Sequence, residues 1–300
     1  MRSVLSLLSV VCCGAVLLPC HAKEGLLERQ EEMLKGRNAT FVLKTSRLQD
    51  AGEGVPSGTK PTVVSSQIVF NPDRAGVRFP PCSTYKIPHT LIALEERVVS
   101  SPDQVVKWDE KQFTIDPDIG EELRRKWAQD MTLRKAFQCS CVWFYQRISR
   151  HVPPATMKGY LEKFDYGNKD NSGQRDRFWL GEGNTLQISA MEQVAFLEKL
   201  HRRAFPLSPQ TYNQAEQVFL TEDAPGYALY SKTGTGKLPS GRYVGWQVGY
   251  AVQKGAGKAP GQSGTVFYFA FNMEGKNMDD IVQNRPGLVR ELLRLHGVVD

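Results

Sequence analysis

Residues 227–252 of this chain are YALYSKTGTGKLPSGRYVGWQVGYAV. The two ends of this stretch, 227–231 and 243–252, are rich in β-branched and aromatic side chains, and a connection with Pro and Gly separates them. Residues 265–272 have the same character and follow a second Gly-rich connection. Such runs are typical of neighbouring antiparallel strands. The sequence therefore predicts three consecutive antiparallel strands here.

A similar pattern occurs near the other end of the chain. Residues 40–44 and 62–70 are rich in Val, Ile, Thr and Phe with a turn-prone segment between them, so we expect an early hairpin with a long loop. Elsewhere the apolar spacing is helical, and Ser189 and Glu192 form a capping-box pattern. The expected helices cover residues 83–99, 132–151, 189–203 and 286–296. Strands at both ends around a helical middle predict an α+β fold, in which helices and a helical lobe flank one antiparallel sheet.

Composition excludes several classes of protein. The 300 residues are 41% apolar and 23% charged, unlike a disordered chain, a disulfide scaffold or a coiled coil. The 38 Lys and Arg and 32 Asp and Glu are spread along the chain. Because a nucleic-acid interface needs clustered positive charge, no nucleic-acid partner is expected.

The N-terminal residues have the features of an export signal. Arg2 gives a positively charged start, and residues 4–18 are apolar or small. Small residues also lie at the −3 and −1 positions of a possible cleavage site after Ala22. The apolar run is shorter than the roughly 20 residues of a spanning helix. We therefore expect residues 1–22 to be a signal peptide and residues 23–300 to form a single domain, periplasmic or secreted, without a membrane span.

Cleavage after Ala22 would leave three cysteines, Cys82, Cys139 and Cys141. Cys139 and Cys141 are too close in sequence for an easy mutual bridge, and buried free thiols are a better interpretation than a bridge from Cys82. The five histidines are scattered singly, so neither a metal site nor a Ser-His-Asp triad is expected.

Two short motifs carry candidate chemistry. Ser83 precedes Lys86 by three residues, which places both on one face of a helix start. A serine is a good nucleophile only beside a base, and a lysine acts as that base when burial lowers its pKa. The motif Lys232-Thr233-Gly234 combines a positive charge, a hydroxyl and a strand edge that a ligand can approach. Taken alone, the Ser83–Lys86 motif is more typical of a helix cap than of a catalytic site. The Lys232-Thr233-Gly234 motif alone is as typical of a strand end as of a binding site.

Three further motifs lie between these two. They are Ser140-Cys141-Val142, Tyr166-Gly167-Asn168 and Phe178-Trp179-Leu180. Together with S-x-x-K and K-T-G, the ordered set resembles the class D, oxacillinase-type, serine β-lactamases of the penicillin-recognising serine enzyme superfamily. No S-D-N motif, typical of class A enzymes, is present. The resemblance covers residues 81–236 and implies a serine β-lactamase or DD-peptidase-like fold, with residues 23–300 as one catalytic domain.

The resemblance also implies roles for individual residues. Ser83 would be the acylated nucleophile, and Lys86 would be carboxylated to N6-carboxylysine and act as the general base. Val142 would line the lysine pocket, Trp179 would donate its indole N–H to the modified lysine, and Ser140 would relay a proton to the β-lactam nitrogen. Apart from CO₂ or bicarbonate for Lys86, no cofactor is implied.

The resemblance implies a second group of residues that bind the substrate, and these are Lys232, Thr233, Gly234, Thr235 and Arg285. The backbone N–H groups of Ser83 and Thr235 would form the oxyanion hole. Arg285 is the best match for an arginine that holds the substrate carboxylate, and Arg290 is the alternative because the local spacing departs from the family pattern.

Three functions remain open from the sequence. The leading hypothesis is hydrolysis of small-molecule β-lactams. The alternative is a penicillin-binding DD-peptidase or sensor-type domain that is acylated without efficient turnover, and the third is a basic exported binding protein with fortuitous motifs. A homodimer is compatible with each, and the sequence does not rank penicillins, oxacillin, cephalosporins and carbapenems.

Overall fold

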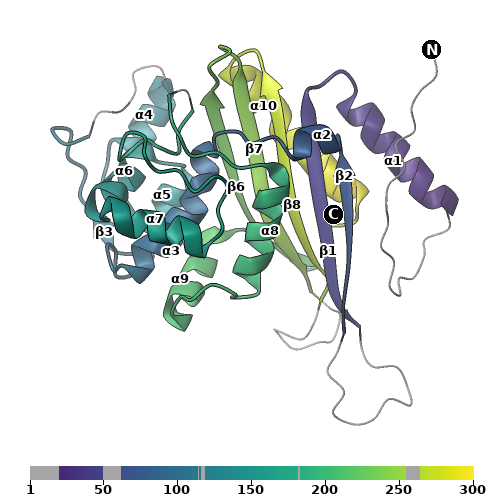
Figure 1. The fold of residues 1–300 in the computed structure, drawn as a ribbon, viewed down its shortest axis with the longest axis horizontal. Coiled ribbons are helices and arrows are strands. Elements are labelled where there is room, and N and C mark those ends of the chain that lie inside the picture. The colour runs from purple at the N-terminus through teal and green to yellow at the C-terminus, as the bar shows by residue number, and fades with distance from the viewer. Residues whose placement is uncertain (1–19, 50–61, 114, 116–118, 182, 255–263) are drawn as a thin grey trace, which may run out of the picture.

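The computed structural model describes residues 20–49, 62–113, 115, 119–181, 183–254 and 264–300 (Figure 1). Most of the expected signal peptide and the long loop of the early hairpin lie outside these residues. The expected cleavage position after Ala22 falls in the first turn of helix α1, Cys20–Leu34. Within the described ranges, none of the helices combines the length and the apolar composition that a bilayer crossing requires.

One six-stranded sheet forms the centre of the molecule, with strand order β2-β1-β8-β7-β6-β5 and antiparallel pairing throughout. Its strands are β1 (Ala39–Gln49), β2 (Thr62–Phe70), β5 (Leu220–Asp223), β6 (Tyr227–Lys237), β7 (Tyr243–Gln253) and β8 (Val266–Gly275). The early hairpin and the three consecutive strands predicted from the sequence are confirmed. A separate two-stranded sheet pairs β3 (Val105–Val106) with β4 (Met131–Thr132).

Helices cover both faces of the large sheet (Figure 1). Most of those that follow β2 form a helical lobe on one side, whereas α1 and α10 (Met278–Leu295) lie on the other. The lobe-side elements are α2 (Pro72–Ala75), the 3₁₀ helix η1 (Cys82–Tyr85), α3 (Lys86–Glu95), α4 (Glu121–Trp127), α5 (Leu133–Gln138), α6 (Val142–His151), α7 (Pro154–Lys163), α8 (Ala190–His201) and α9 (Pro209–Phe219). The predicted α+β architecture with a helical lobe is confirmed.

Strand β8 shows why the core has two parts. Its side chains alternate between faces, so Phe267, Phe269 and Phe271 pack in the cluster beneath α10, whereas Tyr268 and Ala270 pack in the cluster shared with the lobe. Both faces of a central strand are therefore buried, and its sequence is apolar at nearly every position.

Two helix predictions were wrong. Residues 132–151 form two helices, α5 and α6, because the chain turns at Ser140 with φ 58°. The left-handed conformation there is one that glycine or asparagine usually supplies, and neither marks the break in the sequence. The C-terminal helix begins at Met278 rather than Pro286, since Asn277 caps it by accepting from the backbone N–H of Asp280.

The capping box predicted at Ser189 is present. Its side chain accepts from the backbone N–H of Glu192, whose carboxylate accepts from the backbone N–H of Ser189. Helix α8 follows it to His201 and packs against the lobe-facing side of the sheet. Helices α7 and α9 and strand β5 were not predicted, although Pro209 after Ser208 was an available helix-start pattern.

Candidate active site

Ser83 and Lys86 meet at the junction of η1 and α3. The Nζ atom of Lys86 donates a hydrogen bond to the Oγ atom of Ser83 at 2.8 Å. The Lys86 side chain is 0% exposed, and burial lowers its pKa to about 8. Ser83 itself is partly exposed. A nucleophile that faces solvent is thus paired with a buried amine that loses its proton more readily than a surface lysine.

Two backbone contacts fix the start of η1. The N–H of Cys82 donates to the carbonyl of Trp179 at 2.9 Å, and Cys82 has a left-handed φ of 50°. On the other side, β6 passes so closely that a Cβ on Gly234 would lie 2.9 Å from the Pro81 carbonyl oxygen and 3.2 Å from the Ser83 nitrogen. The glycine of K-T-G therefore allows the strand to lie directly against the serine.

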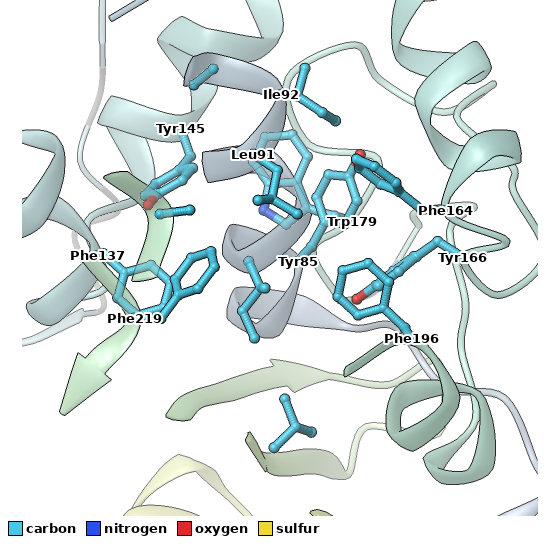
Figure 2. Close-up of a cluster of buried hydrophobic side chains, with 14 of the residues drawn as sticks. Tyr85, Leu91, Ile92, Phe137, Tyr145, Phe164, Tyr166, Trp179, Phe196 and Phe219 are labelled. Atoms are coloured by element: carbon cyan, nitrogen blue, oxygen red, sulfur yellow. The ribbon is translucent and has the colours of Figure 1, made fainter. Parts of the chain in front are cut away.

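Aromatic rings enclose Lys86. Tyr85, Tyr145 and Trp179 surround helix α3 in Figure 2, and the Nζ atom of Lys86 lies 5.3 Å from the centre of the Tyr145 ring. The hydroxyl of Tyr85, which needs a partner in an apolar site, donates to the sulfur of Met157 at 3.2 Å. This enclosure excludes water and is the physical cause of the lowered pKa of Lys86.

The indole N–H of Trp179 is a buried donor that has no hydrogen-bond acceptor among the described residues. The other two fully buried tryptophans differ, since Trp246 donates to the Pro80 carbonyl at 2.9 Å and Trp143 donates to the Trp127 carbonyl at 2.7 Å. An unpaired buried donor costs about 1–3 kcal/mol. Because the Trp179 ring packs against Tyr85 and His89 in the lysine enclosure, its position suits an added acceptor there.

The junction of α5 and α6 brings Ser140 to the same region. Cys139 and Cys141, on either side of it, act electrostatically on Lys86 and partly offset the lowering of its pKa by burial. Val142, the first residue of α6, is partly buried against the main core. Ser140 holds a left-handed backbone, a conformation that costs a non-glycine residue about 1–3 kcal/mol and is concentrated at functional sites.

Lys232, Thr233 and Gly234 lie within β6 rather than at its end, because the strand continues to Lys237. The sequence predicts a fixed positive charge at Lys232. Instead, burial and the charges of Lys86 and Arg285 lower its pKa, and its Nζ atom donates to the Thr233 carbonyl at 3.1 Å. A bound anion would raise this pKa again, since an opposite charge favours the protonated amine.

The structure separates the two candidate arginines. Arg285 is 6% exposed in α10, and its Nη1 atom donates to the Gly234 carbonyl and to the Oγ1 atom of Thr235, both at 2.9 Å. Burial lowers the pKa of Arg285 to about 10, and its Nε atom has no acceptor within the described part of the chain. Arg290 instead pairs with Glu222 at 2.7 Å. Arg285 is therefore the arginine beside K-T-G.

The Tyr166-Gly167-Asn168 motif contacts the segment that follows Trp179. The Asn168 side chain donates to the Thr185 carbonyl at 2.8 Å and accepts from the Gln187 N–H at 3.0 Å. Gly167 has φ 54°, and a Cβ there would lie 2.0 Å from the Gln187 carbonyl oxygen. The motif thus holds the segment that carries Trp179 against the body of the lobe.

Cys82, Cys139 and Cys141 are free thiols. Cys82 and Cys141 are buried, and Cys139 is partly exposed. The described residues contain no group of three or more His, Cys, Asp and Glu arranged to hold a metal ion.

Sequence reasoning missed two walls of the lysine enclosure, His89 and Tyr145. His89 is fully buried, and its Nε2 atom shares a hydrogen bond of 2.9 Å with the Oγ atom of Ser149. Its spacing of three from Lys86 on α3, and that of Tyr145 from Val142 on α6, could have identified both.

A serine with a buried lysine at one helix start, beside a K-T-G strand, defines a penicillin-recognising serine enzyme. The chain matches the family model of the penicillin binding protein transpeptidase domain over residues 59–285. It is 36% identical to β-lactamase OXA-10 of Pseudomonas aeruginosa over 75% of this chain and 78% of the relative. It is 33% identical to β-lactamase OXA-2 of Salmonella typhimurium over 91% and 87%.

A solved structure agrees. The class D β-lactamase FUS-1 from Fusobacterium nucleatum subsp. polymorphum superposes with a TM-score of 0.72 at 28% identity, covering 92% of this chain and 99% of that one. This chain belongs to the class D serine β-lactamases, and it is a β-lactam-hydrolysing enzyme.

Proposed function

We propose that the enzyme hydrolyses β-lactams through an acyl-enzyme on Ser83, with a carboxylated Lys86 as the general base. The observation that carries this proposal is the pairing of a fully buried Lys86, bonded to Ser83, with the unpaired indole N–H of Trp179. The Lys86–Ser83 pair would supply a nucleophile with its base. The Trp179 N–H would supply a hydrogen-bond donor for the carboxylate on the modified Lys86.

The lysine and its surroundings fit carboxylation. Carbamate formation requires a neutral amine, and a pKa of about 8 leaves roughly a quarter of Lys86 neutral at pH 7.5. The carboxylate that CO₂ adds to Lys86 would supply a base for the Ser83 proton and, later, for water. Trp179 would hold that group in place, because an indole nitrogen can only donate.

The remaining residues bind and orient the substrate. The backbone N–H groups of Ser83 and Thr235 would stabilise the oxyanion, and each such donor is worth about 10²–10³ in kcat. Ser140 would pass a proton to the β-lactam nitrogen as the ring C–N bond breaks. Arg285 and Lys232 would attract the substrate carboxylate, and Thr233 would donate a hydrogen bond to it.

The distribution of the site residues over the fold supports a single catalytic domain. They come from η1, from the α5–α6 junction, from the segment that carries Trp179, and from β6 and α10, so both the sheet and the lobe are needed. We therefore propose residues 23–300 as a single catalytic domain. Export to the periplasm or beyond the cell after cleavage near Ala22 remains our proposal from the N-terminal sequence.

Steady-state turnover of a chromogenic cephalosporin by the wild type and by Lys86→Ala tests the hydrolytic role. The wild type should turn over many times, whereas Lys86→Ala should lose turnover. Intact-mass spectrometry should show no acyl adduct on the wild type after the substrate is consumed. The matched control is Lys126→Ala, because Lys126 lies on exposed α4 and pairs only with Glu122 there. A wild type that binds penicillin once and retains it would instead support the penicillin-binding alternative.

Carboxylation is tested separately with ¹³C-labelled bicarbonate. We expect a carbamate ¹³C NMR signal that is absent in Lys86→Ala and weaker in Trp179→Phe, together with a turnover of Trp179→Phe that added bicarbonate partly restores. Trp143→Phe is the control, since the Trp143 N–H bonds a backbone carbonyl away from the lysine. A wild type without a carbamate signal at saturating bicarbonate would exclude the modified lysine.

A further inference from the structure

The three residues between α5 and α6 contain two thiols, one on either side of Ser140. Cys139 ends α5 and Cys141 caps α6, and Ser140 between them has φ 58°. The turn is closed by backbone hydrogen bonds, from the Ser140 N–H to Phe137 at 3.1 Å and from the Cys141 N–H to Ala136 at 2.8 Å. Because of this turn, the Cys139 and Cys141 thiols flank a single residue and each influences the protonation of the other, while the Sγ atom of Cys139 lies 3.8 Å from the Sδ atom of Met131.

We propose that Cys139 and Cys141 are an oxidisable pair, and that a disulfide between them reversibly lowers turnover by displacing Ser140. A spacing of two residues disfavours a bridge in an extended chain. The left-handed turn at Ser140 shortens the separation of the flanking Cα atoms, and disulfides need Cα atoms about 4.4–6.8 Å apart. The effect on turnover rests on the proposed function, but the oxidation itself does not.

The two thiols have the different environments that such a reaction needs. Cys139 is partly exposed, and the neighbouring Cys141 thiol lowers the pKa of Cys139 to about 7. Burial raises the pKa of Cys141 and raises that of Cys82 to about 12. Since the thiolate is the attacking species, Cys139 reacts first and Cys141 follows from within the protein.

The oxidant is a low-molecular-weight disulfide. The Cys139 thiolate attacks one sulfur of that molecule, forms a mixed disulfide and releases one thiolate. Cys141 then gives its proton to the released thiolate and attacks the Cys139 sulfur, which breaks the mixed disulfide and releases a second thiolate that takes a proton from water. The protein pair loses two electrons, and the small disulfide is reduced to two thiols.

The bond would move the catalytic serine. A disulfide holds its sulfurs about 2.05 Å apart, much closer than two sulfurs that are not covalently bonded. The ends of α5 and α6 would be drawn together, and Ser140 is the single residue between them. A displacement of about 1 Å in a catalytic group can cost up to about 10²-fold in rate.

The experiment treats the full chain with oxidised glutathione at pH 7.5, blocks remaining thiols with iodoacetamide, and maps peptides by mass spectrometry. We expect a linked Cys139–Cys141 peptide lighter by two hydrogen atoms, a turnover lowered by about tenfold or more, and full recovery with dithiothreitol. Cys139→Ser and Cys141→Ser should form no such link and should keep their turnover under oxidation. Cys82 should be alkylated only after unfolding.

Three results would overturn the proposal. These are two free thiols after treatment, a glutathione adduct on Cys139 that Cys141 never resolves, and a linked peptide whose formation leaves turnover unchanged. If the reduced enzyme has no turnover at all, the proposed function fails, whereas the peptide map still decides whether the pair is oxidisable.

Discussion

At the scale of single residues, burial decides what each charged side chain can do. Lys86 and Lys232 are both almost fully buried, yet Lys86 bonds Ser83, whereas Lys232 bonds the Thr233 carbonyl and lies 5.6 Å from the centre of the Phe137 ring. Burial, and then the charges of Lys86 and Arg285, lower the pKa of Lys232, whereas burial is the main cause of the lowered pKa of Lys86 and of Arg285. An anionic substrate would stabilise the protonated forms of Lys232 and Arg285.

Substitution of Arg285 and of Arg290 should have different effects on substrate binding. Arg285→Ala should raise KM for carboxylate-bearing β-lactams by about 10- to 100-fold, because a charged hydrogen bond contributes about 1.5–3 kcal/mol. Arg290→Ala should leave KM unchanged, since its partner is Glu222. Steady-state kinetics on both variants check this, and equal KM values for Arg285→Ala and the wild type would remove Arg285 from the binding site.

The individual motif residues were predictable because each motif is contiguous. Ser83 and Lys86 lie one helical turn apart, and their hydrogen bond follows from local geometry. The pairing of Arg285 with Thr235 was harder, because the two are 50 residues apart and α10 had to be placed first. The unpaired N–H of Trp179 could not be predicted, since it depends on what every neighbouring element leaves unsatisfied.

At the scale of elements, the α5–α6 junction shows where sequence patterns fail. Apolar residues continue with helical spacing through Phe137, Val142 and Tyr145, so periodicity alone predicts one helix. The break has neither Gly nor Pro, and tertiary packing holds Ser140 in a conformation its own type disfavours. Likewise, Pro286 suggested a helix start although it lies inside α10.

Ser140 at this junction should be sensitive to substitution in both turnover and stability. Both Ser140→Gly and Ser140→Ala should lose turnover, because both lack the hydroxyl. The glycine variant should be about 1 kcal/mol more stable than the alanine variant, since only glycine takes a left-handed backbone without a steric cost. Urea unfolding measures the difference. Equal stability of the two would mean that the backbone at Ser140 is not strained.

At the scale of the whole molecule, the site depends on elements from distant parts of the chain. Helix α10 lies across the sheet from the lobe, yet it delivers Arg285 to the K-T-G strand that lies against Ser83 (Figure 1). Gly245 allows this approach, because a Cβ there would lie 2.2 Å from a side-chain carbon of Ile281. The sheet is thus the frame that connects the arginine on one face with the serine on the other.

Three histidines with lowered pKa values link the stability of the fold to pH. Desolvation lowers the pKa of the buried His89 and of the partly buried His201 and His296, the last to about 4. In the unfolded chain they bind protons below about pH 6.5. The unfolded state therefore binds more protons as pH falls below 6.5, and the free energy of unfolding must fall with it.

Stability should accordingly be constant with respect to these groups above pH 6.5 and decrease from there toward pH 4. Each histidine contributes up to about 1.4 kcal/mol per pH unit. Urea unfolding at pH 7.5, 6.5, 5.5 and 4.5 measures the slope, which should be shallower in His296→Gln because one of the three protons is then lost. A free energy of unfolding that stays level from pH 6.5 to 5 would contradict the lowered pKa values of these side chains. It would also imply that the His89 ring beside Trp179 carries a charge in the native enzyme.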